Sequence, residues 1–182
     1  MCIRDSPRIS RNVRGGVYRS RFLRDLCLSD EVSLFLSDIA GINISPHTIP
    51  HQLGHINFNP LELEKNVDKW HVDTLTFDYV LFVTDPKKNN GGEFQYLKDF
   101  RNADKNEMNF EGVDKLLTGS IAPRILTMEP GTLVLFRGRN SIHRVTPTIG
   151  DTKRILVVLA YNSEPRIALS ESARKTFYGR LS

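Results

Sequence analysis

The sequence predicts a mainly β domain, a sandwich or a barrel, supported by α-helices, and three observations lead to this fold class. Short runs of apolar and β-branched residues alternate with turn signals between residues 69 and 161, as in all-β sandwiches and barrels. A helical pattern of apolar residues precedes them at 20–40. The 182 residues, 40% of them hydrophobic, suffice for one sizeable core. We therefore expect a single domain over residues 20–182.

The amino-terminal part is expected to form a basic arm followed by helical support. Seven arginines lie between Arg4 and Arg24, so residues 1–19 are expected to be a disordered, solvated arm, with contact to nucleic acid or anionic lipid as the alternative. Residues 1–6 resemble a translated adapter and are expected to be non-native, which leaves open a missing native segment. Over 20–40, Ser29 or Asp30 is a candidate helix cap and Gly41 ends the helical pattern.

The rest of the chain is expected to be a β-core over about 50–165. Prolines and Gly54 limit the first part to an extended stretch at 51–58. Residues 105–118 are expected to form a short helix or an irregular insertion, and 170–179 a last helix. The other expected strands are 69–73, 77–84, 93–97, 125–128, 132–137, 143–147 and 154–161.

Composition and charge exclude several classes of protein. The formal net charge is +4, but no aromatic ladder or zinc-finger spacing accompanies it, so no nucleic-acid partner is expected. The sequence contains neither an apolar run of about 18 residues nor the start of a secretory signal, so no membrane partner is expected. Cys2 and Cys27 are too few for a disulfide framework. We expect a cytoplasmic protein with a small-molecule substrate; the oligomeric state is not indicated.

The pair His71 and Asp73 is the first candidate for metal binding. In a strand, residues i and i+2 point to the same face, so both side chains are expected in the barrel interior. With His143 they form a set of two imidazoles and one carboxylate, which can hold non-haem Fe(II) on one face and leave the other open. Either histidine alone is more often structural, and Zn(II) or Mn(II) accepts the same donors.

Arg154 predicts an anion close to that metal. It begins an otherwise apolar strand, where an inward guanidinium is costly unless it meets a negative charge. We expect the strand of His143 to turn near Gly150 and return with Arg154 as a hairpin, so that both arms line one cavity. A planar guanidinium suits a carboxylate, which predicts a small dicarboxylate beside the metal. An ion pair with Glu93 or Asp151 is the structural alternative.

These four residues, in this order, resemble the Fe(II)- and 2-oxoglutarate-dependent dioxygenase superfamily over roughly residues 50–165. The run 131–136, which leads to the second histidine, belongs to the resemblance. The runs 91–96 and 138–147 are similar to the group that includes hydroxylases and halogenases of free amino acids. The resemblance implies a double-stranded β-helix (jelly-roll, cupin-like) fold with flanking α-helices at both ends.

The resemblance also implies roles for individual residues. His71, Asp73 and His143 would be the iron ligands and catalytic centre, and Arg154 would bind the distal carboxylate of 2-oxoglutarate, with O2 as the other co-substrate. In the halogenases of the group a small residue replaces the carboxylate ligand, so that chloride can occupy its place. Because Asp73 is present, the resemblance favours hydroxylation, or a related oxidation such as desaturation. The expected substrate is a small polar molecule, such as a free amino acid or a derivative, and the expected co-products are succinate and CO2.

Three further residues are candidates for ligand contacts. His55 and Asn57 share one face of an extended strand, so His55 is expected to reach the substrate and Asn57 the co-substrate. Arg139 lies close to the second histidine and is a candidate partner for a substrate carboxylate, the alternative being a solvated surface arginine.

Two other functions remain open on sequence grounds. A cupin-like metal-dependent hydrolase or isomerase would use the same three donors, but it would leave Arg154 without a role. A non-catalytic jelly-roll binding domain would have no need for three intact ligands.

Overall fold

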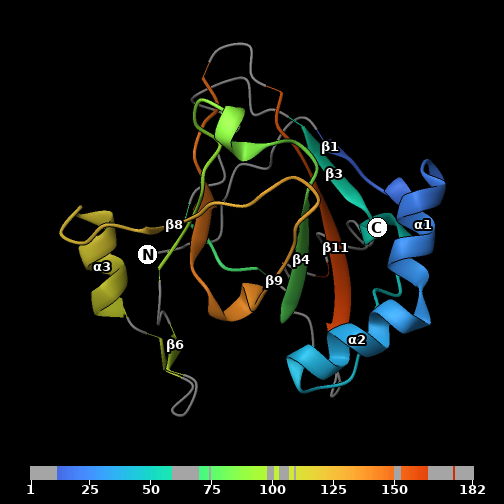
Figure 1. Cartoon of the computed structure of the whole chain (residues 1–182). Helices are drawn as coiled ribbons and strands as arrows, with labels where there is room; N and C mark the ends of the chain where they lie inside the picture. Colours follow the sequence, from blue (N-terminus) through green and yellow to red (C-terminus); the bar gives the residue numbers. More distant parts are fainter. Residues whose placement is uncertain are drawn as a thin grey trace, which may run out of the picture.

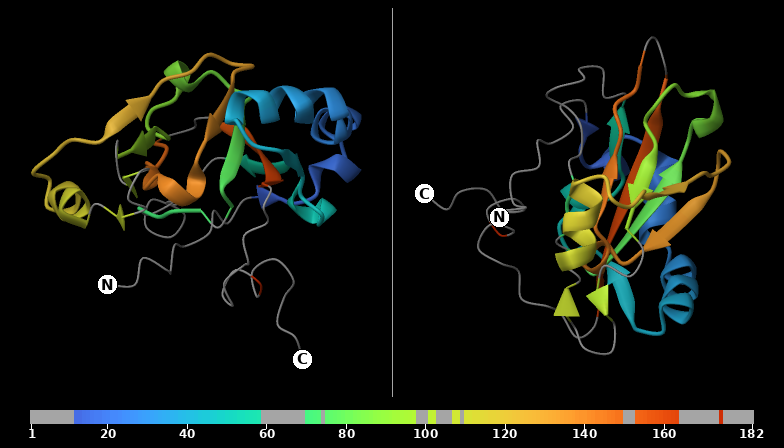
Figure 2. Two further views of the ribbon diagram at one scale, coloured as in Figure 1. Left: turned by 90° about the horizontal axis from the view of Figure 1, so that it is seen from below. Right: turned by 90° about the vertical axis from the view of Figure 1, so that its left-hand side faces the viewer.

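Two antiparallel β-sheets face each other, and two helices cover the outer face of the larger sheet (Figures 1 and 2). The computed structural model describes residues 12–58, 70–73, 75–97, 101–102, 107–108, 110–149, 153–163 and 174. Within these ranges, no helix combines the length and the apolar character needed to cross a membrane. The two facing sheets confirm the predicted jelly-roll fold.

The larger sheet has six strands in the order β1-β3-β11-β4-β9, with β2 paired to β11. Its strands are β1 (Asn12–Val13), β2 (Ile44–Pro46), β3 (His55–Phe58), β4 (Phe77–Phe82), β9 (Leu133–Phe136) and β11 (Ile155–Ser163). The smaller sheet consists of β10 (His143–Val145), β5 (Phe94–Tyr96) and β8 (Arg124–Leu126), in that order. A separate pair is formed by β6 (Arg101–Asn102) and β7 (Glu107–Met108).

Side chains of the larger sheet alternate between two environments. Tyr79 pairs with Leu159, and both are completely buried against the helices. One position along, Val80 pairs with Val158, and both face the smaller sheet. Because successive side chains of a strand point to opposite faces, the same two strands build the core on one side and a cavity wall on the other.

The helices that cover the larger sheet are α1 (Arg21–Leu28) and α2 (Asp30–Ala40). The helical pattern at 20–40 is confirmed, and it is divided at Ser29, whose side chain caps α2 by accepting the N–H of Val32. Gly41 ends α2 with a φ of 68°, a conformation that glycine adopts without steric cost. The core between the helices and the sheet includes Leu23, Cys27, Leu36, Tyr79, Val157, Leu159 and Tyr161.

A third helix, α3 (Phe110–Leu117), confirms the helix expected within 105–118. Its Val113 and Leu116 pack with Leu97 and Ile142, which lie next to the strands of the smaller sheet. Four short 3-10 helices complete the described elements: η1 (Gly16–Tyr18), η2 (Pro50–Gln52), η3 (Pro86–Lys88) and η4 (Gly138–Asn140). The last helix expected at 170–179 lies outside the described residues, except for the helical Arg174.

Several expected boundaries are wrong. Residues 12–19 are not a disordered arm, because β1 pairs with β3 and the N–H of Gly16 donates to the carbonyl oxygen of Gly54. The stretch at 51–58 begins with η2 rather than as a strand, because Pro50 starts a helical turn. Residues 70–73 contain a single bridge at His71 in place of a strand, and the strand at 125–128 begins at Arg124 and ends at Leu126.

The expected hairpin between the strands of His143 and Arg154 is also wrong. The strand β10 pairs with β5 in the smaller sheet, whereas β11 pairs with β2, β3 and β4 in the larger one. The chain therefore crosses from one sheet to the other between the two strands. His143 and Arg154 nevertheless line one cavity, because they face it from opposite sheets.

Candidate metal centre and cavity

Backbone hydrogen bonds bring the three predicted metal ligands together. The N–H of His71 donates to the carbonyl oxygen of His143, and the N–H of His143 donates to that of His71, both at 3.0 Å. This antiparallel bridge holds the two imidazoles side by side, with ring centroids 4.4 Å apart. The N–H of Asp73 donates to the carbonyl oxygen of Gly138 at 2.9 Å, which places the carboxylate beside both rings.

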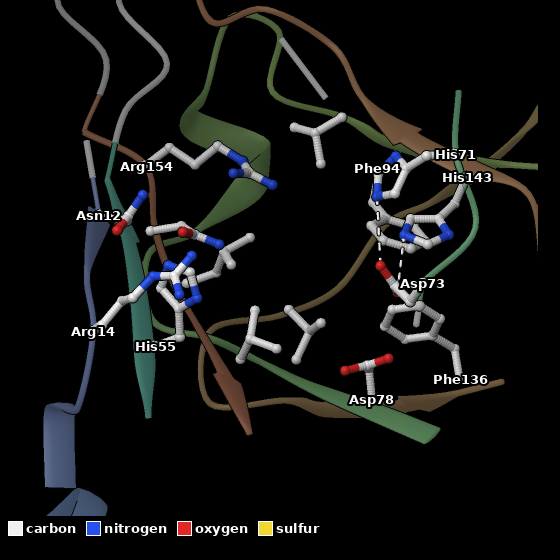
Figure 3. A pocket seen from close by; sticks show the side chains of 15 residues that line it. Asn12, Arg14, His55, His71, Asp73, Asp78, Phe94, Phe136, His143 and Arg154 are labelled. Carbon is white, nitrogen blue, oxygen red and sulfur yellow. Dashed lines mark ion pairs between the residues drawn. The ribbon is translucent and has the colours of Figure 1, made fainter. Parts of the chain in front are cut away.

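The donor atoms of these side chains converge on one point. One ligand atom from each of the three residues lies within 4.8 Å of the others. The distance from Asp73 Oδ1 to His71 Nε2 is 3.5 Å, and that from Asp73 Oδ2 to His143 Nε2 is 3.3 Å (Figure 3). Burial alone raises the pKa of Asp73, but the charges and hydrogen bonds of His143 and His71 hold it well below its usual range. Asp73 is therefore ionised, as a metal ligand must be.

The ring of His143 is fixed in orientation and tautomer. Its Nδ1 lies 2.9 Å from the carbonyl oxygen of Ser141, which only accepts, so Nδ1 carries the proton. Nε2 then faces Asp73. The ring stacks on Phe94, with a centroid distance of 5.3 Å, and meets the edge of Phe136 at 5.0 Å. His143 is only 4% exposed, so these contacts hold the imidazole in one orientation.

A second carboxyl group, Asp78, lies beside this centre. A Cβ added to Gly138 would lie 2.6 Å from Asp73 Oδ2 and 2.5 Å from Asp78 Oδ2, so only glycine fits between the two acids. Burial and then the negative charge of Asp73 raise the pKa of Asp78 well above its ordinary value. The sequence pattern did not single out Asp78, although an acid inside the apolar strand β4 was an available signal.

Arg154 lies against a glycine turn and is 3% exposed. Its Nε donates to the carbonyl oxygen of Gly92 at 2.9 Å, and its guanidinium points into the cavity (Figure 3). Gly92 has a φ of 71°, and a Cβ there would come within 2.6 Å of Arg154 Cδ. The turn at Gly92 thus needs glycine for its backbone conformation and for the arginine beside it.

A cavity of about 240 Å³ between the two sheets connects Arg154 with the three donors. The three predicted metal ligands and Asp78 lie at one end, and Asn12, Arg14, His55 and Arg154 lie at the other (Figure 3). The wall between the two ends is apolar and comprises Val80, Phe94, Phe136, Val145, Leu156 and Val158. The arrangement suits a molecule that binds a cation at one end and presents a carboxylate at the other.

The minor sequence-based candidates divide into two groups. His55 and Asn57 line the cavity from β3, as their shared face predicted. Arg139 is not among the lining residues that the structure describes, because the short helix η4 points Gly138, its neighbour, at Asp73 and Asp78. Asn12 and Arg14 line the cavity and were missed, because β1 is too short for a strand pattern.

The chain is similar to a described family and to several solved structures. Residues 3–177 match the family model described as Halogenase D. No curated protein matches the chain. An oxidoreductase of the 2OG-Fe(II) oxygenase family from Burkholderia pseudomallei is 16% identical, with a TM-score of 0.50; the match covers 78% of this chain and 55% of that one. AviO1 from Streptomyces viridochromogenes Tue57 is 15% identical, with a TM-score of 0.60 and coverages of 87% and 69%.

EctD from S. alaskensis, solved with bound Fe, has 16% sequence identity and a TM-score of 0.63, and the match covers 88% of this chain and 59% of EctD. Another structure of EctD contains 2-oxoglutarate and 5-hydroxyectoine. This chain therefore spans between 55% and 69% of the lengths of these three neighbours. At such identities the likeness establishes the shared fold.

Proposed function

We propose that this chain, which belongs to the halogenase D family, is an Fe(II)- and 2-oxoglutarate-dependent oxygenase that hydroxylates an unactivated C–H bond of a small polar molecule. A free amino acid or a derivative is the substrate class we favour. The observation that carries the proposal is the shape of one cavity: His71, Asp73 and His143 converge at one end, and the guanidinium of Arg154 faces the other.

The donor set fits Fe(II). Two imidazoles and a carboxylate on one face leave open positions for a chelating co-substrate and for O2. The proton on His143 Nδ1 directs the lone pair of Nε2 to the metal position, and Asp73 is already ionised. With 2-oxoglutarate and O2 bound, the iron supplies the oxidising chemistry and the co-products are succinate and CO2. The protein's contribution is to hold each partner in place.

Arg154 is proposed to bind the distal carboxylate of 2-oxoglutarate. The Gly92 carbonyl oxygen holds Nε, which leaves the end of the guanidinium facing the cavity. A charge-assisted contact there would be strong because Arg154 is buried. The apolar wall formed by Leu156 and Val158 suits the methylene carbons of the co-substrate, and Asn57 is a further candidate contact.

Arg14, with His55 beside it, is our candidate for binding an anionic group of the prime substrate. The pairing of Asn12 with Asn57, continued along the strands, sets Arg14 opposite His55. Arg14 directly follows β1, and Arg154 directly precedes β11. The strand β3 lies between β1 and β11 in the sheet. Arg14 and Arg154 therefore reach the cavity from different strands, which supports separate anion contacts for the substrate and the co-substrate. Arg14 takes the role that the sequence had suggested for Arg139.

Asp73 favours hydroxylation although the family is described as a halogenase. The halogenases that the sequence resembles carry a small residue at this ligand position, and chloride takes the place of the carboxylate. Here the two carboxylate oxygens of Asp73 lie 3.5 Å and 3.3 Å from the imidazole Nε2 atoms. A carboxylate so placed would occupy the coordination position that chloride needs.

Anaerobic addition of Fe(II) and 2-oxoglutarate tests the proposal. The wild-type protein is expected to develop the weak visible charge-transfer band of the iron chelate, and His143→Ala is expected to lose it because the metal loses a buried donor. His51→Ala is the matched control, since His51 is exposed and does not line the cavity, and it should keep the band. An absent band in the wild type, or an undiminished band in His143→Ala, would contradict the proposal.

A further inference from the structure

The two histidine ligands have neighbours that meet on the side of the chain away from the cavity. Trp70 precedes His71 and Arg144 follows His143, and neither side chain is among the described residues that line the cavity. The guanidinium carbon of Arg144 lies 4.6 Å from the centroid of the Trp70 ring. This is a cation-π contact, and Arg144 and Trp70 are both half-buried, which strengthens it.

Hydrogen bonds continue this contact across the outer face of the smaller sheet. Arg144 Nε donates to Gln95 Oε1 at 2.8 Å, and Gln95 Nε2 donates to Glu93 Oε2 at 2.8 Å. Gln95 is 8% exposed and lies directly opposite Arg144 in the pairing of β5 with β10. Trp70 in turn packs on the cluster that contains Leu97 and Val113. Arg144 therefore connects the segment of His71 to the smaller sheet.

The segment of His71 needs such a connection because few backbone contacts hold it. Within the described residues 70–73, the backbone hydrogen bonds are the bridge between His71 and His143 and the bond from Asp73 to Gly138. His143, by comparison, belongs to the ladder of β10 with β5. Side-chain contacts of the neighbouring Trp70 can therefore add to the positioning of the His71 imidazole.

We propose that Trp70, Arg144 and Gln95 form an outer strap, in which Arg144 is a positioning residue that holds His71 at the distance from His143 that a metal ion requires. The inference rests on the proposed metal site and adds to it. Arginine suits this role because its planar group can cover the indole ring and donate from Nε to Gln95 at the same time. A lysine ammonium lacks that second, fixed donor.

Titration with Co(II), followed by its visible d–d absorption, tests the strap without turnover. Arg144→Ala is expected to weaken Co(II) binding by about tenfold or more, the usual effect of losing a residue that orients a metal ligand. Arg144→Lys should recover part of this loss. Trp70→Leu should lose about as much as Arg144→Ala, and the double variant should lose little more, because the two changes break one contact.

Val113→Ala is the matched control for stability. It removes atoms from the cluster on which Trp70 packs and leaves Arg144, Gln95 and Glu93 in place. Each variant's unfolding midpoint in denaturant is measured together with its Co(II) dissociation constant.

The strap is supported if Arg144→Ala binds Co(II) more weakly than Val113→Ala at a similar loss of stability. It is overturned if the wild type binds Co(II) and Arg144→Ala binds as tightly, or if Val113→Ala loses as much. A wild type that binds no Co(II) would overturn the strap and the proposed metal site together.

Discussion

The two ends of the cavity have opposite chemistry. The metal end presents two imidazoles and the carboxylate of Asp73, the donor types that bind a cation. The far end presents the guanidinium groups of Arg14 and Arg154, which only donate. An apolar wall separates them. One elongated ligand, with a chelating group at one end and an anionic group at the other, can therefore contact both ends at once.

The ends also differ in how the chain builds them. At the metal end, His71 is held by a single bridge, and Asp73 is held by one backbone hydrogen bond to Gly138 in the short helical turn η4. The far end stands on the continuous ladder of β1, β3 and β11. A ladder positions side chains by its regular register, whereas a segment outside the ladders depends on individual contacts, such as the bond from the Asp73 N–H to the carbonyl oxygen of Gly138. We therefore expect the metal end to be the more sensitive to substitution.

The largest effect is expected from Asp73→Gly. Removing the carboxylate opens a coordination position, so 2-oxoglutarate-dependent succinate formation should fall by more than about 100-fold, the upper range for residues that only surround metal ligands. Chloride should shift the visible Fe(II) and 2-oxoglutarate band of this variant and leave the wild-type band unchanged. Asp73→Glu, which keeps a carboxylate, should not respond to chloride. A chloride shift in the wild type would argue for halogenation.

Arg154→Ala addresses the far end and is expected to have the next largest effect. The 2-oxoglutarate concentration that half-saturates the visible band should rise by at least about tenfold, because a buried charge-assisted contact is lost. The band itself should still form at saturation, since the metal ligands are untouched. An unchanged requirement for 2-oxoglutarate would show that Arg154 is structural.

Gly92→Ala tests the same contact between Arg154 and 2-oxoglutarate, but it keeps the charge of the arginine. The added Cβ would lie within 2.6 Å of Arg154 Cδ, so it should displace the guanidinium and raise the 2-oxoglutarate requirement as well. Gly131→Ala is the control, because Gly131 also has a positive φ, of 84°, but no atom within 4 Å of an added Cβ. It should share the backbone strain and leave 2-oxoglutarate binding unchanged.

The smallest effects concern the apolar wall between the two ends, and two adjacent valines provide a matched pair. Val157 is 3% exposed and packs under the helices, so Val157→Ala should lower the free energy of unfolding by about 2 kcal/mol. Val158 is half-buried and lines the cavity, so Val158→Ala should cost less than about 1 kcal/mol. Denaturant unfolding measures both. Equal losses would mean that the cavity wall carries as much packing as the helix-covered face.

Much of the fold follows from local patterns that the sequence displays. The helices at 20–40 end at Ser29 and Gly41, where capping chemistry acts within one turn. The strands β4, β5, β9, β10 and β11 lie within the expected runs or extend them by two residues. The pairing of His143 and Arg154 in one hairpin was wrong, because a turn between two strands does not specify which sheet each strand joins.

The sequence alone predicted that His71, Asp73 and His143 would lie together and that Arg154 would line the same cavity. Residue type and spacing carry that information, because coordination and charge pairing demand particular atoms. The folded arrangement brings Arg14 and Asp78 into the same cavity, leaves Arg139 outside its described lining and lays Arg144 over Trp70. These contacts join residues far apart in the chain, and such contacts depend on how sheets face each other, which no local pattern records.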